Sequence, residues 1–335
     1  MRAALVLTLA VAFPALLPLP ASAQDTHVLA VVGLGGDPAY AESFLEWGLR
    51  IRAASMERFG MAEERVTLLS EDPGMDAAVD GRSDRAGVEA AVAAMAERAG
   101  PRDRILVVLV GHGSFRGDEA RFNLPGPDLT AQEWEALLGR FGDRPVALVN
   151  AASSSGPFVP ALSAPGRIVI TATKTGGERN ETQFGRFFAE ALEGDAADLD
   201  KDGMLSLLEA FTYTRAEVAR FYQEADLLAT EHALLDDDGD GEGSEEPSRD
   251  GPDGASAAVF RLVAPTAVTA APEVLGDSVL VRLMNERAEL ETRVARLRAI
   301  RETLDPAEYE ARLEELLVEI ALKNREIGAR GGGGL

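Results

Sequence analysis

Residues 27–194 alternate short apolar segments with amphipathic helical ones, and this alternation constrains the fold more than any other feature of the chain. The apolar segments are nearly continuous, which predicts buried strands at 27–36, 65–72, 104–113, 144–150 and 166–174. Helical spacing of apolar residues predicts helices at 39–60, 87–100, 128–142 and 181–194. Strands of this kind are covered on both faces. The sequence therefore predicts an α/β fold with a mostly parallel sheet and helices on both faces.

The first 23 residues have the pattern of a secretory signal peptide. Arg2 precedes a long apolar run, and Ala21-Ser22-Ala23 has the small residues of a cleavage site, so the mature chain is expected to begin at Gln24. A membrane anchor is the alternative, but Pro14 and Pro18 interrupt a run that is already short for a spanning helix. We expect an exported protein, periplasmic or extracellular, with no membrane span.

Composition excludes several classes of function. The chain has no cysteine, so disulfides, thiolate metal sites and a thiol nucleophile are all excluded. Its net charge is −23, from 33 basic and 56 acidic residues. Residues 195–250 alone hold 17 acidic residues against 4 basic ones. Such a segment repels nucleic acid and anionic membranes and attracts cations.

Residues 198–209 match the spacing of a twelve-residue EF-hand loop. Calcium prefers six to eight oxygen ligands, and an EF-hand supplies them from loop positions 1, 3, 5, 7, 9 and 12, with a glycine at position 6. Gly203 occupies position 6. The predicted ligands are Asp198, Asp200, Asp202, the carbonyl of Met204, Ser206 and Glu209. The alternative is an acidic loop whose spacing arose by chance.

A second acidic stretch repeats this pattern less completely. Asp236, Asp238 and Asp240 match the first three ligand positions, but Pro247 occupies position 12 and has no side-chain oxygen. Two interpretations stay open at this point: a flexible acidic loop and a second, irregular cation site. We group the whole of 195–250 as an EF-hand and acidic calcium-binding segment.

The remaining residues predict four further segments. Residues 251–264 read as a last strand returning to the sheet, and 265–275 as a linker. Apolar spacings of 3, 4 and 7 over 276–329 predict two helices broken at Pro306, a helical hairpin or coiled coil. This pair would mediate self-association or partner docking, or would fold back on its own domain. Residues 330–335 are expected to be disordered.

Two predicted strands end in turns with reactive residues. The first turn carries His112-Gly113, and the second has the sequence Asn-Ala-Ala-Ser-Ser-Ser-Gly, which ends at Gly156. This order resembles cysteine peptidases of the caspase and legumain type, in which a histidine before a glycine follows one strand and the catalytic cysteine follows the next. The resemblance covers about 27–194, within an expected domain of 24–194. It implies that Ser153 stands in the cysteine position and Ala151 in that of an acidic residue.

The missing cysteine leaves two main hypotheses. The first is an exported calcium-binding scaffold that binds a peptide or protein and has no peptidase activity. The second is a calcium-dependent serine hydrolase in which His112 would activate Ser153. A serine nucleophile usually needs a carboxylate to orient its histidine, and Asp118 is the nearest downstream candidate. A third hypothesis is a calcium-stabilised envelope protein in which the helical tail carries the function.

Overall fold

A computed structural model describes residues 25–262 and 304–331 of the chain. It also describes eight residues between them: 283, 286, 287, 290, 293, 294, 297 and 301. The predicted signal peptide (1–23) and linker (265–275) lie outside the described residues.

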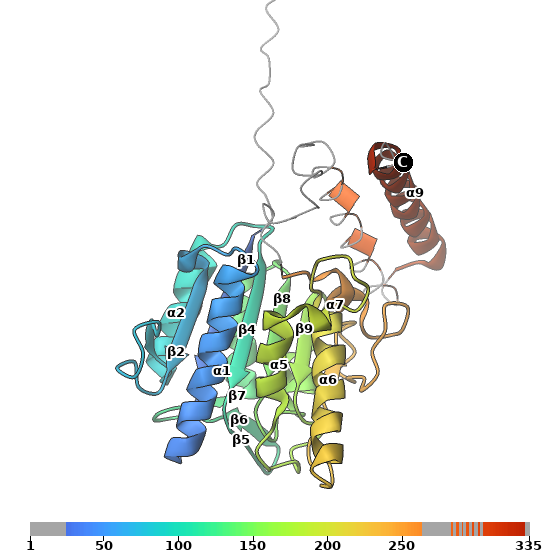
Figure 1. Cartoon of the computed structure of the whole chain (residues 1–335). Coiled ribbons are helices and arrows are strands. Elements are labelled where there is room, and N and C mark those ends of the chain that lie inside the picture. The colour runs from blue at the N-terminus through green and yellow to red at the C-terminus, as the bar shows by residue number, and fades with distance from the viewer. Residues whose placement is uncertain are drawn as a thin grey trace, which may run out of the picture.

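The main sheet confirms the predicted α/β class. Among the described residues, seven strands lie in the order β10-β9-β8-β4-β1-β2-β3. They are β1 (Thr26–Val32), β2 (Val66–Ser70), β3 (Gly81–Arg82), β4 (Arg104–Val110), β8 (Val146–Asn150), β9 (Arg167–Thr171) and β10 (Leu234–Asp236). All neighbouring strands are parallel except β10, which is antiparallel to β9. The sheet is therefore mostly parallel (Figure 1).

Helices cover both faces of this sheet. Within the described segments they are α1 (Pro38–Glu57), α2 (Arg85–Arg98), α3 (Ala131–Leu138), α4 (Phe158–Leu162), α5 (Phe184–Glu193), α6 (Leu207–Glu224), α7 (Ala255–Val259) and α9 (Pro306–Gly331). Helices α1, α5 and α6 lie side by side across one face (Figure 1). Their core includes the even-numbered β1 residues Val28 and Ala30. The odd-numbered Leu29 and Val31 face a second core with α2, α3 and α4. This alternation explains why the strands are apolar throughout.

A small antiparallel sheet follows β4 and was not predicted from the sequence. It consists of β5 (Gly113–Arg116), β6 (Glu119–Phe122) and β7 (Leu129–Thr130). β5 begins directly after His112, so this sheet lies at the carboxyl edge of the main sheet (Figure 1). Part of the helix predicted over 128–142 is β7. The helix itself starts at Ala131, where Thr130 and Glu133 form a capping box.

The predicted returning strand within 251–264 is wrong. Residues Ala255–Val259 form α7, and only a single antiparallel bridge, between Ser206 and Arg261, follows it. The physical reason is a helix start that the apolar pattern does not reveal. The buried carboxylate of Asp237 accepts hydrogen bonds from the backbone N–H groups of Gly254 and Ala257, at 2.9 and 2.7 Å. The last strand of the sheet is instead β10, which lies inside the acidic segment.

At the C-terminal end, α9 begins at Pro306, at the predicted break. Leu316 of α9 packs against Leu290, Val294 and Leu297, all of them helical. The helix continues to Gly331, so residues 330 and 331 are helical and do not belong to a disordered tail; 332–335 lie outside the described residues. In the described part of the chain, no helix has both the length and the apolar character that crossing a membrane requires.

Candidate functional site

The turns that carry His112 and Ser153 meet at the carboxyl edge of the sheet. β4 and β8 are neighbours in parallel register, with Leu109 opposite Asn150, so the residues after them leave the sheet side by side. The backbone N–H of Gly113 donates to Ser153 Oγ, and this hydroxyl donates to the Gly113 carbonyl, both at 3.3 Å. The crevice at this edge is where ligands bind in open parallel sheets.

Gly113 is required by this close approach of the two turns. A Cβ at this position would lie 2.3 Å from the carbonyl oxygen of Ser153 and 3.0 Å from that of Arg121. Both neighbours are backbone atoms, which cannot move aside as a flexible side chain can. Packing alone therefore explains the glycine of the His-Gly pair, whether or not the histidine has a chemical role.

His112 lies among aromatic side chains of α1. Its ring makes edge contacts with Tyr40 and Phe44, each at 4.9 Å between ring centres. Burial lowers the pKa of the imidazole, so the neutral form dominates at pH 7. No hydrogen bond joins the His112 ring to Ser153 or to a carboxylate within the described ranges. Asp118 is exposed in the turn between β5 and β6.

The three consecutive serines are all covered by the fold. Ser153, Ser154 and Ser155 are 2%, 1% and 1% exposed. Ser155 Oγ lies 3.1 Å from Thr173 Oγ1 and accepts the Thr173 N–H. Ser154 has a left-handed backbone with φ of 55°, and its buried hydroxyl has no hydrogen-bond partner. A nucleophile must reach its substrate, and none of these hydroxyls does so in this conformation.

Acidic residues from two other segments complete this edge. The carbonyl of Glu178 accepts the Ser154 N–H at 2.8 Å, and its carboxylate lies 2.5 Å from His232 Nδ1. Glu231 is 3% exposed and accepts the backbone N–H groups of Gln183 and Phe184 at the start of α5. Sequence reasoning missed Glu231, because nothing in its local pattern places it under a helix N-terminus.

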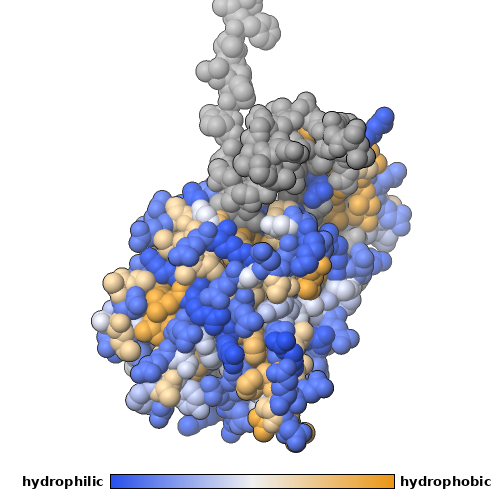
Figure 2. Space-filling view, in the orientation of Figure 1, coloured by the Kyte–Doolittle hydropathy of each residue, from blue (hydrophilic) through white to orange (hydrophobic). Residues whose placement is uncertain are grey.

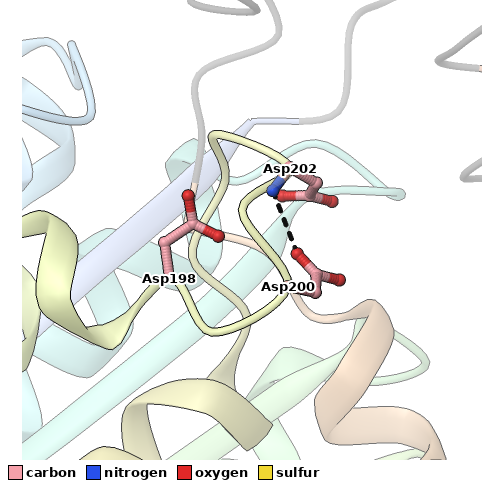
Figure 3. A group of neighbouring side chains, drawn as sticks. All are labelled: Asp198, Asp200 and Asp202. Atoms are coloured by element: carbon pink, nitrogen blue, oxygen red, sulfur yellow. Dashed lines mark hydrogen bonds between the residues drawn. The ribbon is translucent and has the colours of Figure 1, made fainter.

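The first acidic loop brings its first three predicted ligands together. One carboxylate oxygen from each of Asp198, Asp200 and Asp202 lies within 4.8 Å of the others (Figure 3). The Asp202 N–H donates to Asp200 Oδ1 at 3.1 Å, and the Gly203 N–H donates to Asp198 Oδ2 at 3.0 Å. Gly203 has a φ of +79°, which suits a glycine at the sharp turn of the loop. These groups could hold a metal ion.

Asp198 has one carboxylate oxygen with a hydrogen bond and one without. It is 7% exposed, and its second carboxylate oxygen, Oδ1, is buried without a hydrogen bond. An unsatisfied buried carboxylate oxygen is costly, and a bound cation would remove that cost. Burial also raises the pKa of Asp202, which a nearby cation would lower again.

Two further predicted ligands lie at the start of α6. Ser206 is the N-cap of this helix: its hydroxyl accepts the Glu209 N–H at 3.2 Å and donates to Glu209 Oε2 at 2.7 Å. Glu209 Oε1 accepts the N–H of Leu199 at 3.0 Å, so this carboxylate closes over the loop. The Met204 N–H donates to Asp202 Oδ1 at 2.8 Å. The loop and the helix start thus form one hydrogen-bonded unit.

The second acidic loop repeats the hydrogen bonds of the first. The Gly241 N–H donates to Asp236 Oδ2 and the Asp240 N–H to Asp238 Oδ1, both at 3.0 Å. Asp236 and Asp238 lie within 4.8 Å of Asp253, and these three could also hold a metal ion. Asp240 is not part of this group.

Asp253 is a residue that the EF-hand spacing cannot find. It lies 17 residues after Asp236, well beyond position 12, and is 3% exposed. Burial, together with repulsion from Asp237, Asp238 and Asp236, raises its pKa to about 7. The missing acid at position 12 was the only hint in the sequence that another carboxylate completes this group.

The acidic loops lie at the opposite end of the sheet from His112 and Ser153. Gly239 of the second loop packs against Ala164 and Pro165, just before β9. At the first loop, Ser206 forms a bridge with Arg261, and the carbonyl of Arg261 accepts a hydrogen bond from the guanidinium of Arg104, the first residue of β4. In Figure 1, α7 and the small sheet β5-β6-β7 mark these two ends. A cation in either loop would therefore not touch the serine turn.

Comparison with protein-family models and with curated proteins finds no match for this chain.

Proposed function

We propose that the mature protein is an exported, calcium-binding scaffold of the caspase and legumain type that has no peptidase activity. Its carboxyl edge would bind a peptide or protein, and calcium would stabilise the opposite end of the sheet. The observation that carries the calcium part is the buried, unpartnered Oδ1 of Asp198 beside Asp200 and Asp202. Export, to the periplasm or the outside of the cell, rests on residues 1–23 and is part of the proposal.

The donor set fits calcium better than a transition metal. The loop offers carboxylate, hydroxyl and carbonyl oxygens and no sulfur, and the only histidines of the chain are at positions 27, 112 and 232. A bound calcium ion would supply positive charge that offsets the mutual repulsion of the acidic side chains. Ser206 and Asp198, 4% and 7% exposed, would be its most buried ligands, with Asp200, Asp202, Glu209 and the Met204 carbonyl completing the set predicted from the sequence.

The lack of catalysis is supported by the state of the serine turn. Ser153 is covered and its hydroxyl is bonded to the Gly113 backbone, while His112 has aromatic neighbours and no carboxylate to orient it. The resemblance to caspases and legumain is supported by the adjacency of β4 and β8, which brings both turns to the same edge.

Calorimetric titration tests the calcium part. We expect calcium to bind the mature wild-type chain and to raise its melting temperature, by an amount that grows with the free calcium concentration. Asp198→Asn should weaken or abolish binding at the first loop. Asp72→Asn is the matched control, because Asp72 makes a similar turn bond to Gly74 in another loop. Equal binding by both variants, or none by the wild type, would refute the assignment.

Labelling with a fluorophosphonate, which reacts with activated serines, tests the lack of catalysis. We expect no labelling of the folded protein with calcium or with chelator. Labelling that disappears in both Ser153→Ala and His112→Ala would instead establish the serine hydrolase. Labelling that persists in Ser153→Ala would point to another serine.

A further inference from the structure

The face of α9 that points away from its packed side carries an uncovered apolar stripe. Leu317, Val318 and Leu322 are 47%, 52% and 53% exposed. Ala321 lies among them, and the positions 317, 318, 321 and 322 fall on one side of the helix. Figure 2 shows hydrophobic surface where α9 lies. This outer face is separate from the inner face, where Leu316 packs against Leu290, Val294 and Leu297.

Charges at the two ends of this stripe have opposite sign. Glu310 and Glu314 lie toward the N-terminal end and Arg325 toward the C-terminal end, all of them exposed. Within the described part of the chain, none of the three forms an ion pair. The steps from 310 to 314, 317, 321 and 325 are four, three, four and four residues, so charges and apolar side chains follow one line along the helix.

We propose that the outer face of α9 is a dimer interface, in which the α9 helices of two copies of this chain pack antiparallel. A twofold axis between Leu317 and Val318 brings these side chains of both copies together. The same axis places Glu310 at the level of Arg325 of the second copy, and Glu314 at the level of its Ala321. Both ends of the stripe thereby find a complementary charge.

The charge pattern favours a second copy of this chain as the partner, with its α9 antiparallel to the first. In a parallel pair, each of Glu310, Glu314 and Arg325 would lie opposite the same residue of the second copy. Like charges would then repel at both ends of the stripe. An antiparallel pair replaces these repulsions with two Glu310–Arg325 pairs. A twofold interface is self-complementary, and a stripe that is acidic at one end and basic at the other has this property.

Disulfide trapping tests the direction, because the chain has no cysteine of its own. We expect the double variant Glu310→Cys/Arg325→Cys to form disulfide-linked dimers on mild oxidation, while each single variant stays largely unlinked. A parallel pair would link each single variant to itself, which would overturn the antiparallel arrangement. No crosslinking by any of the three would overturn the interface.

Sedimentation of the mature chain at about 0.15 M salt tests the interface without new cysteines. We expect a reversible dimer whose Kd rises roughly tenfold or more in Leu317→Asp, which would bury a carboxylate at the axis. Leu228→Asp is the matched control, since Leu228 is 90% exposed on the sheet domain, and it should leave Kd unchanged. Glu310→Arg should weaken the dimer, and adding Arg325→Glu should restore it. A monomeric wild type, or loss of the dimer in both aspartate variants, would overturn the proposal.

Discussion

Replacing Glu231 by glutamine should change how the stability of this protein depends on pH. Glu231 is buried beneath the start of α5, where its carboxylate accepts the Gln183 N–H at 2.7 Å and the Phe184 N–H at 3.1 Å. The Tyr222 hydroxyl also donates to it at 3.1 Å. Burial outweighs these three donors and raises the pKa of the carboxyl to about 7.

The sign and size of the effect follow from this pKa. The folded chain holds the Glu231 proton up to about pH 7, whereas an ordinary glutamate releases it near 4.5. The protonated carboxyl therefore favours the folded state at low pH, and this contribution is lost as pH rises from about 4.5 to 7. At about 1.4 kcal/mol per pH unit, the loss amounts to about 3 kcal/mol. Glutamine cannot ionise, so Glu231→Gln should lack this loss.

Urea denaturation at several pH values from 4.5 to 8 measures the difference. We expect the free energy of unfolding of Glu231→Gln, relative to wild type, to increase by about 3 kcal/mol across this range. Tyr222→Phe is the control that keeps the carboxylate. It removes one donor to the charged form, so the pKa of Glu231 should rise further and the pH-dependent loss should extend above pH 7.

A constant difference between Glu231→Gln and wild type, within about 0.5 kcal/mol at every pH, would refute this reasoning. It would mean that the donors from Gln183, Phe184 and Tyr222 keep the carboxylate ionised throughout. The helix N-terminus would then outweigh burial at this position.

Two further substitutions test local features of the fold. Gly113→Ala should destabilise the protein by about 3 kcal/mol, because its Cβ would lie 2.3 Å from the Ser153 carbonyl oxygen. Gly139→Ala is its control: it has a helical φ of −57° and nothing within 4 Å of the added Cβ, so we expect no loss and a gain of up to about 1 kcal/mol. Thr130→Ala should lower the free energy of unfolding by about 1 kcal/mol, since it removes the hydroxyl that accepts the Glu133 N–H at the start of α3. Thermal denaturation measures all three, and a Gly113→Ala variant as stable as Gly139→Ala would contradict the close approach of the two turns.

The long elements were predictable because their patterns are local. Strands such as 104–113 are apolar over several residues in succession, and only burial on both faces in a parallel sheet explains that composition. The meeting of the two turns that carry His112 and Ser153 also followed, because strand–helix alternation brings strand ends to one edge. The grouping of Asp198, Asp200 and Asp202 could be predicted from their spacing alone, because the three are alternate residues of one short loop.

The elements that were missed depend on contacts distant in sequence. Residues 255–263 have the apolar content of a strand, but the carboxylate of Asp237 starts a helix there, and it lies about twenty residues upstream. β10 is only three residues long and lies within an acidic segment, so its pattern is too short to detect. Asp253 joins Asp236 and Asp238 only because the chain folds back between them.

Helix α6 is the element that connects the two ends of the sheet. It begins in the first acidic loop, where Ser206 and Glu209 form its capping box, and near its other end Tyr222 donates to Glu231. A cation at the loop and a ligand at the carboxyl edge would therefore lie toward opposite ends of one helix. Such a connection couples two sites only if the helix has two arrangements that each ligand favours differently. Since α6 packs along the same core as α5 over its length, the simpler expectation is that calcium stabilises the fold without changing affinity at the edge.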